Sequence, residues 1–83
     1  LAEPTFLVAW AAVGLAKVLR SLGVHACIKW PNDILVNDRK IAGILVERRA
    51  ATIVGIGVNA NIPREAFPHD LRLPASSLAI ELG

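Results

Sequence analysis

The segment Lys29-Trp30-Pro31-Asn32-Asp33 places an ammonium, an amide and a carboxylate within one short stretch. The residues before it alternate between apolar and polar types, which predicts a strand that stops at Pro31, because proline cannot donate to a ladder. Pro31 fixes its own φ and favours an extended residue before it. The polar side chains of Lys29, Asn32 and Asp33 would then be held stiffly at one sheet edge, as a binding site requires. An ordinary strand-to-turn transition explains the same residues, since Asn and Asp form turns readily.

Glycines mark a second candidate region. Gly55 and Gly57 lie inside an apolar run that predicts a strand, where glycine is unfavourable unless a ligand or another backbone approaches closely, or a bulge forms. Asn59 and Asn61 follow on one side if the strand persists, and their amides can donate and accept hydrogen bonds. Gly43 has the same property in the preceding strand. The pattern is no dinucleotide fingerprint, because no helix follows it at once.

The elements that position these residues follow from pattern and breakers. Pro4 suits the first position of a helix that reaches Leu22 and is closed by Gly23, and its many apolar residues predict burial on several sides. Short connections imply an antiparallel meander. Its strands are expected at 24–30, 34–36, 40–48 and 52–59. Residues 60–75 form a loop, and Ser76 or Ser77 caps a short helix that runs through Leu82. The expected class is α/β, in its α+β form: a mostly antiparallel four-strand meander flanked by helices.

Composition limits the class of protein. Eighty-three residues allow one small domain, yet 54% are hydrophobic, which suggests a section of a larger core or one side of an oligomer such as a homodimer. The net charge of +2 comes from dispersed residues, so no nucleic-acid footprint is present. The apolar stretch at 5–16 is too short to span a bilayer and lacks the flanks of a signal peptide. We therefore expect a cytoplasmic protein without a membrane partner.

The remaining metal-binding and reactive side chains give little functional signal. One cysteine, Cys27, excludes an internal disulfide and a cysteine-based zinc site, and its neighbours suggest a small buried residue. His25 and His69 have no partners at metal-ligand spacing, so both are interpreted as structural or surface residues. Trp30 is expected in the core rather than stacked on a ligand.

Three motifs in this order and spacing resemble the central run of biotin–protein ligases: Lys-Trp-Pro-Asn-Asp at 29–33, the segment 39–47 and Gly-Ile-Gly-Val-Asn at 55–59. The leading helix and the segment 73–78 are similar to that family as well. The resemblance implies a mixed α/β catalytic domain related to lipoate ligases and class II aminoacyl-tRNA synthetases. It also implies two half-reactions: biotin and MgATP give biotinyl-5′-adenylate, and biotin then passes to a lysine of a biotin carboxyl carrier domain, such as that of acetyl-CoA carboxylase.

The resemblance also implies roles for individual residues. Lys29 would contact the biotin carboxylate and the adjoining phosphate, where a fixed ammonium offsets charge in the transition state. Asp33 would either help to hold Mg²⁺ or brace Lys29. Lys40 is a weaker candidate, or simply a solvated hairpin residue. The other expected contacts with biotin or the adenylate come from Asn32, Gly43, Gly55, Gly57, Asn59 and Asn61.

The resemblance predicts that residues 1–83 are a partial catalytic domain. In that family a glycine- and arginine-rich loop and a strand that binds the biotin ureido ring should come before residue 1, and a small β-barrel domain should follow. These 83 residues alone should therefore form adenylate near the background rate. The alternative is a noncatalytic truncated relative that serves as a binding or oligomerisation module. A lipoate ligase is disfavoured by the motif at 29–33.

Overall fold

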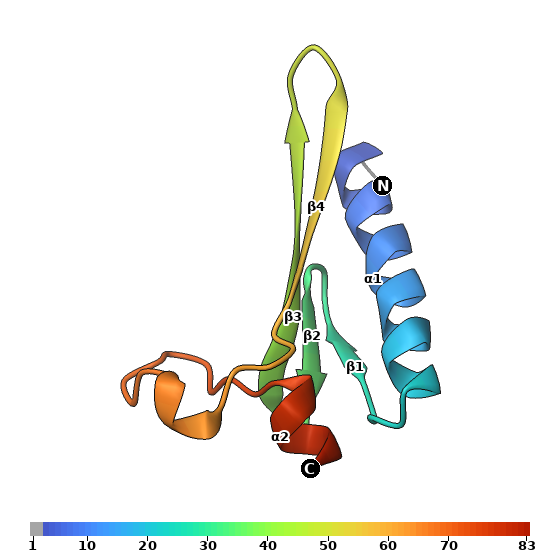
Figure 1. Ribbon diagram of the computed structural model, residues 1–83. Coiled ribbons are helices and arrows are strands. Elements are labelled where there is room, and N and C mark those ends of the chain that lie inside the picture. The colour runs from blue at the N-terminus through green and yellow to red at the C-terminus, as the bar shows by residue number, and fades with distance from the viewer. Residues whose placement is uncertain (1–2) are drawn as a thin grey trace.

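The computed structural model describes residues 3–83 as a sheet of four strands with one long helix on one face (Figure 1). The elements are α1 (Glu3–Ser21), β1 (Cys27–Lys29), β2 (Asp33–Val36), β3 (Arg39–Arg48), β4 (Thr52–Val58), the 3-10 helix η1 (Arg64–Ala66) and α2 (Leu78–Leu82). None of the helices within these residues is long and apolar enough to cross a membrane. The predicted α+β class is confirmed.

The sheet is the predicted antiparallel meander, with its strands in the order β1-β2-β3-β4. Asn37 and Asp38 connect β2 to β3 and both have positive φ, 53° and 61°. This is the type I′ geometry, whose twist matches that of the two flanking strands. The β3–β4 hairpin extends well beyond β1 and β2 (Figure 1). The first strand is shorter than predicted, because it begins at Cys27 rather than at residue 24.

Helix α1 ends where the sequence predicted. Gly23 has a φ of +105°, which favours glycine, and it redirects the chain toward β1. The Arg20 guanidinium then donates from Nε to the Ala26 carbonyl at 2.8 Å, which ties the end of the helix to the chain that enters β1. The expectation of burial on several sides is wrong for the described chain. Trp10 and Val18 on the outer side of α1 are 68% and 56% exposed, because one layer of sheet covers one side of a helix.

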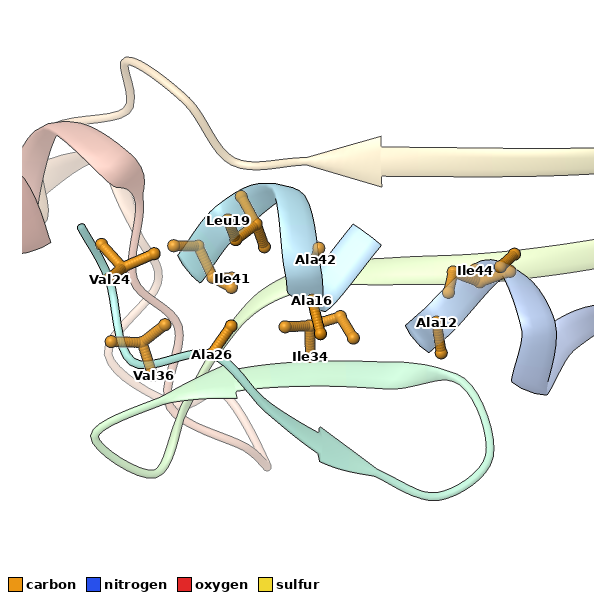
Figure 2. Close-up of a cluster of buried hydrophobic side chains, with 11 residues drawn as sticks. Ala12, Ala16, Leu19, Val24, Ala26, Ile34, Val36, Ile41, Ala42 and Ile44 are labelled. Atoms are coloured by element: carbon orange, nitrogen blue, oxygen red, sulfur yellow. The ribbon is translucent and has the colours of Figure 1, made fainter. Parts of the chain in front are cut away.

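The hydrophobic core lies between α1 and the sheet (Figure 2). Small residues of the helix allow its backbone to approach the strands closely, and branched residues of β2 and β3 fill the space between them. Ile34 and Ile41 are fully buried. The buried cluster comprises Ala11, Ala12, Ala16, Leu19, Val24, Ala26, Ile34, Val36, Ile41, Ala42 and Ile44.

The strand register separates the two faces of the sheet. Ile34 pairs with Ala42 and faces α1, so the neighbouring pairs face the other way. Asp33 pairs with Lys29 on one side and with Gly43 on the other, and Gly43 pairs with Gly57. Lys29, Asp33, Gly43 and Gly57 therefore form one row across the sheet on the face opposite the helix. Among the described elements α1 packs on the other face, against β1, β2 and β3.

The C-terminal segment returns to the sheet beside the start of β3. Ser77 caps α2 by accepting from the Ile80 N–H at 3.3 Å, as the sequence predicted, and its hydroxyl donates to the Ile62 carbonyl at 2.6 Å. Ser76 and Ser77 are fully buried. Ala75 forms a parallel bridge with Lys40. The loop at 60–75 is thereby fastened to β3 at its far end.

Two side-chain predictions are wrong. Cys27 is exposed rather than buried, and Trp30 is 59% exposed rather than in the core. Both lie near the outer strand β1, whose three residues are all exposed. Alternation shows which residues share a face of a strand, but it does not show whether another layer covers that face.

Candidate functional site

A β-bulge in β3 aims Lys40 at the open face of the sheet. Ile34 of β2 pairs with Ala42 of β3, but the next residue, Leu35, pairs with Lys40. Ile41 is therefore the extra residue of the bulge. In a regular strand Lys40 would share the core face with Ala42, because side chains repeat every second residue. The bulge instead puts Lys40 on the face that carries Asp33 and Gly43.

The Lys40 ammonium is held between a carboxylate and a glycine. Its Nζ lies 3.1 Å from Asp33 Oδ1, and the two side chains are 41% and 20% exposed. A Cβ added to Gly43 would lie 3.3 Å from both Cε and Nζ of Lys40, so the lysine side chain passes directly over this glycine. A methyl group at position 43 would therefore press on the end of the lysine side chain.

An open groove of about 530 Å³ extends from this ion pair along β3 and β4. Two further glycines form part of its floor. Apart from the residues next to it in the chain, no described residue has an atom within 4 Å of a Cβ built on Gly57, and a Cβ built on Gly55 would meet the Leu45 carbonyl at 3.6 Å. The lining comprises Asn32, Asp33, Lys40, Gly43, Ile44, Leu45, Gly55, Ile56 and Gly57. The structure thus brings together six of the residues singled out from the sequence.

Lys29, the principal sequence candidate, lies at one end of the row. It is exposed on β1 and pairs with Asp33, about 10 Å from Gly43 at two strand spacings. Lys29 is not one of the described residues that line the groove. Its role at the reacting centre stays a prediction. The cation that lines the groove is Lys40, the weaker candidate from the sequence, and the adjacent apolar residues Ile41 and Ala42, which break the alternation of β3, are the sign of the bulge in the sequence.

Asn59 and Asn61 lie beyond the end of β4. The Asn59 backbone N–H donates to the Ile41 carbonyl at 2.8 Å, and its side-chain Nδ2 donates to the Ser76 carbonyl at 3.1 Å. Asn59 is half-buried, and its amide nitrogen is used to hold the returning C-terminal segment. Asn61 is exposed. Neither is among the described residues of the groove lining, so their contact with adenine or phosphate stays a prediction.

The returning C-terminal segment forms a clamp on Lys40, because it bonds both the N–H and the carbonyl of this residue. The Lys40 N–H donates to the Pro74 carbonyl at 2.7 Å, and the Ser76 N–H donates to the Lys40 carbonyl at 2.9 Å. On the other side of the groove, the Ile44 N–H donates to the Asn32 carbonyl at 2.9 Å and anchors the turn before β2. The site therefore presents a fixed cation beside an open, glycine-floored channel. Such an arrangement suits an extended anionic ligand that lies flat on the sheet.

Comparison with known proteins identifies the family. The model of the biotin/lipoate A/B protein ligase family matches residues 2–61, which is more than half of the chain. This chain belongs to the biotin/lipoate A/B protein ligase family. The matched range contains β1 to β4 and all the residues that line the groove, so membership rests on the part of the chain that forms the candidate site.

Relatives within this ligase family are similar over most of the chain. The bifunctional ligase/repressor BirA of Bacillus subtilis is 40% identical over 80 residues, covering 88% of this chain and 25% of BirA. BirA of Escherichia coli is 42% identical over 69 residues, covering 65% of this chain and 22% of BirA. The biotin–[acetyl-CoA-carboxylase] ligase of Paracoccus denitrificans is 39% identical over 64 residues, covering 70% of this chain and 27% of that ligase. The chain thus spans about a quarter of the length of these relatives.

Solved structures in the same family share the fold. The apo structure of biotin protein ligase from Aquifex aeolicus superposes with a TM-score of 0.66 at 28% identity, covering 96% of this chain and 35% of that one. A variant of the same ligase in complex with biotin gives a TM-score of 0.65, covering 96% of this chain and 33% of that one. The α+β arrangement seen here is therefore that of a biotin protein ligase over about a third of its length.

Proposed function

We propose that this chain carries part of the active site of a cytoplasmic biotin–protein ligase. In the first half-reaction the biotin carboxylate attacks the α-phosphorus of ATP. A carbon-bound oxygen forms a bond to phosphorus, the bond from phosphorus to the bridging oxygen breaks, and pyrophosphate leaves. In the second, the amine of an acceptor lysine attacks the biotinyl carbonyl, loses a proton and displaces AMP. The similarity to a biotin–[acetyl-CoA-carboxylase] ligase and to a biotin protein ligase of known structure supports this choice.

The observation that carries the proposal is the position of the Lys40 ammonium. It projects over Gly43 into a groove that leads past Gly55 and Gly57. A carboxylate and a phosphate approach each other in the first half-reaction, so negative charge accumulates where they join. A cation fixed beforehand by Asp33 and by the backbone clamp stabilises that charge without reorganisation, which is an effective form of catalysis. The glycines leave room for the adenylate against the sheet.

The remaining groove residues take supporting roles in this proposal. Asn32 offers an amide at the rim, and Lys29 extends the positive potential outward along the row toward incoming anions. Asn59 holds the segment that bonds the Lys40 backbone, and Asn61 would contact the nucleotide beyond the end of β4. The biotin carboxyl carrier domain, the acceptor of the second half-reaction, would approach over the open face.

Mg²⁺ accompanies ATP in this chemistry, and Asp33 is the carboxylate in the groove that fits it. Residues 3–83 hold no group of three or more His, Cys, Asp or Glu able to bind a metal ion by themselves. Mg²⁺ usually keeps several waters and binds through one or two carboxylates together with substrate phosphates, so Asp33 alone would be enough if it turned to the ion. In this proposal phosphates and waters hold Mg²⁺ instead, the ion neutralises phosphate charge, and Asp33 holds Lys40.

The deciding experiment is biotin-dependent exchange of pyrophosphate into ATP, measured on the protein made from its full reading frame. Lys40→Met should lower the exchange rate about 100-fold or more, the effect of removing one preorganised donor. Lys29→Met tests the role predicted from the sequence, and we expect a smaller loss because Lys29 lies outside the groove. Lys17→Met, on the exposed side of α1, is the matched control. Full activity of Lys40→Met would reject the proposal.

The second candidate is a noncatalytic module for binding or oligomerisation. The exposed apolar residues Trp10 and Val18 on α1, together with Ile56 on β4, favour it. A module would show no biotin-dependent exchange even when unmodified, and sedimentation would show whether it forms a homodimer. Exchange by the unmodified protein, lost in Lys40→Met, would decide for the ligase.

A further inference from the structure

A second carboxylate, Glu81 on α2, lies outside the groove yet connects three parts of the chain that surround Lys40. Its Oε1 accepts from Asn37 Nδ2 at 2.9 Å, and its Oε2 accepts from the Ser76 hydroxyl at 2.5 Å. Asn37 belongs to the β2–β3 turn, and Ser76 is the residue whose N–H donates to the Lys40 carbonyl. The two oxygens of the half-buried Glu81 carboxylate therefore join the β2–β3 turn to the segment 74–76, which bonds the Lys40 backbone.

The energetics favour a rigid connection. Ser76 is fully buried, and hydrogen bonds to an ionised carboxylate are stronger than those between neutral groups. Asn59 adds a further bond to the Ser76 carbonyl, so Ser76 is fixed through its hydroxyl, its N–H and its carbonyl. Any loosening of Ser76 would release one of the two backbone bonds that hold Lys40.

We propose that Glu81 is a positioning residue: through Ser76 it holds the segment 74–76 against the Lys40 backbone and so sets where the ammonium stands. The catalytic consequence rests on the function proposed above. The structural consequence does not, because it concerns only the hydrogen bonds of Lys40. The two are therefore tested separately.

Amide hydrogen exchange on the full-length protein tests the clamp directly. In Glu81→Ala the Lys40 and Ser76 amides should exchange about ten-fold faster or more, a loss of roughly 1.4 kcal/mol in opening free energy. The Ile44 amide, bonded to Asn32 within the sheet, should keep its wild-type rate. Unchanged Lys40 and Ser76 amides would overturn the proposal. So would equal acceleration of all three, since that indicates general destabilisation.

Two further variants keep the test decisive if Glu81→Ala folds poorly. Asn37→Gly preserves a turn residue with positive φ but removes the amide donor, and it should accelerate Lys40 exchange less than Glu81→Ala does. Glu81→Gln keeps both contacts, since its oxygen still accepts from Asn37 and the Ser76 hydroxyl can accept from its amide, but it lacks the charge, so it should accelerate Lys40 exchange less than Glu81→Ala does. Glu47→Ala removes an exposed carboxylate paired with Arg49 at 3.2 Å and is the control.

The functional arm is a double-mutant cycle in pyrophosphate exchange. Glu81→Ala alone should lower the rate about ten-fold, in the range found for residues that orient other functional groups. In a Lys40→Met background the same change should have no further effect, because the group that it positions is gone. A full ten-fold loss in both backgrounds would show that Glu81 does not act through Lys40. If the unmodified protein lacks biotin-dependent exchange, the function fails while hydrogen exchange still decides the clamp.

Discussion

The Lys40 ammonium lies 3.1 Å from the Asp33 carboxylate across the β2–β3 pair, at a place where only a β-bulge brings the two side chains to the same face. Lys40 is 41% exposed, and partly exposed ion pairs contribute about 0–1 kcal/mol to stability. The pair therefore matters less for the stability of the fold than for the orientation of the lysine. The ion pair keeps the ammonium in one place over Gly43, so the cation need not reorganise when a substrate anion arrives.

Asp33→Asn separates the two roles open to this carboxylate. The amide keeps the size of the side chain but removes the charge that holds Lys40. We expect kcat for adenylate formation to fall about ten-fold, while the Mg²⁺ concentration for half-maximal rate stays unchanged, because Asp33 acts on Lys40. The measurement is a Mg²⁺ titration of pyrophosphate exchange in both proteins. A several-fold rise in the half-saturating concentration would instead make Asp33 a metal ligand.

The groove glycines should respond differently to one methyl group. At Gly57 an added Cβ meets no atom of the described residues within 4 Å, so Gly57→Ala should fold normally and remain within about 0.5 kcal/mol of wild type. The methyl would occupy ligand space, and KM for ATP should rise several-fold with kcat little changed. At Gly43 the methyl lies 3.3 Å from the end of Lys40, so Gly43→Ala should displace the ammonium and lower kcat.

Gly14 supplies the control for these substitutions. It lies on the exposed side of α1, and a Cβ there meets no described atom within 4 Å. Gly14→Ala should stabilise the helix by about 0.5–1 kcal/mol and leave both kinetic constants unchanged. Equal KM values for Gly57→Ala and Gly14→Ala would place the ligand elsewhere.

Local rules in the sequence sufficed for the elements but not for the aim of the key side chain. Gly23 and the Asn37-Asp38 turn specify backbone conformations that few residues adopt, so the helix end and the meander could be predicted. Lys40 is the weaker candidate in the sequence because a lysine beside a hairpin turn can simply be solvated, and only the bulge brings it to the face of Asp33. A bulge changes every face assignment on one side of it, and its position depends on pairing between strands.

Exposure was the other property that the sequence left open. Helix α1 and strand β1 carry apolar residues on more than one side, and apolar side chains are usually buried, so the pattern predicts that several of their sides are covered. Whether that burial occurs depends on which layers surround them. Within residues 3–83 a single sheet covers α1, so Trp10 and Cys27 are exposed where the pattern predicted contact.

Ser77 anchors α2 and gives a stability prediction that is independent of catalysis. Its hydroxyl donates to the Ile62 carbonyl at 2.6 Å and accepts from the Ile80 N–H at 3.3 Å, and the residue is fully buried. Ser77→Ala removes the helix cap, worth about 1 kcal/mol, and takes the Ser77 hydroxyl away from the partly buried Ile62 carbonyl, which costs about 1 kcal/mol more. We expect the free energy of unfolding to fall by roughly 2 kcal/mol or more in urea titrations. Ser21→Ala, whose exposed hydroxyl bonds the Val18 carbonyl at the end of α1, should change it by less than about 0.5 kcal/mol. Equal stability of the two variants would mean that α2 does not hold the clamp segment in place through Ser77.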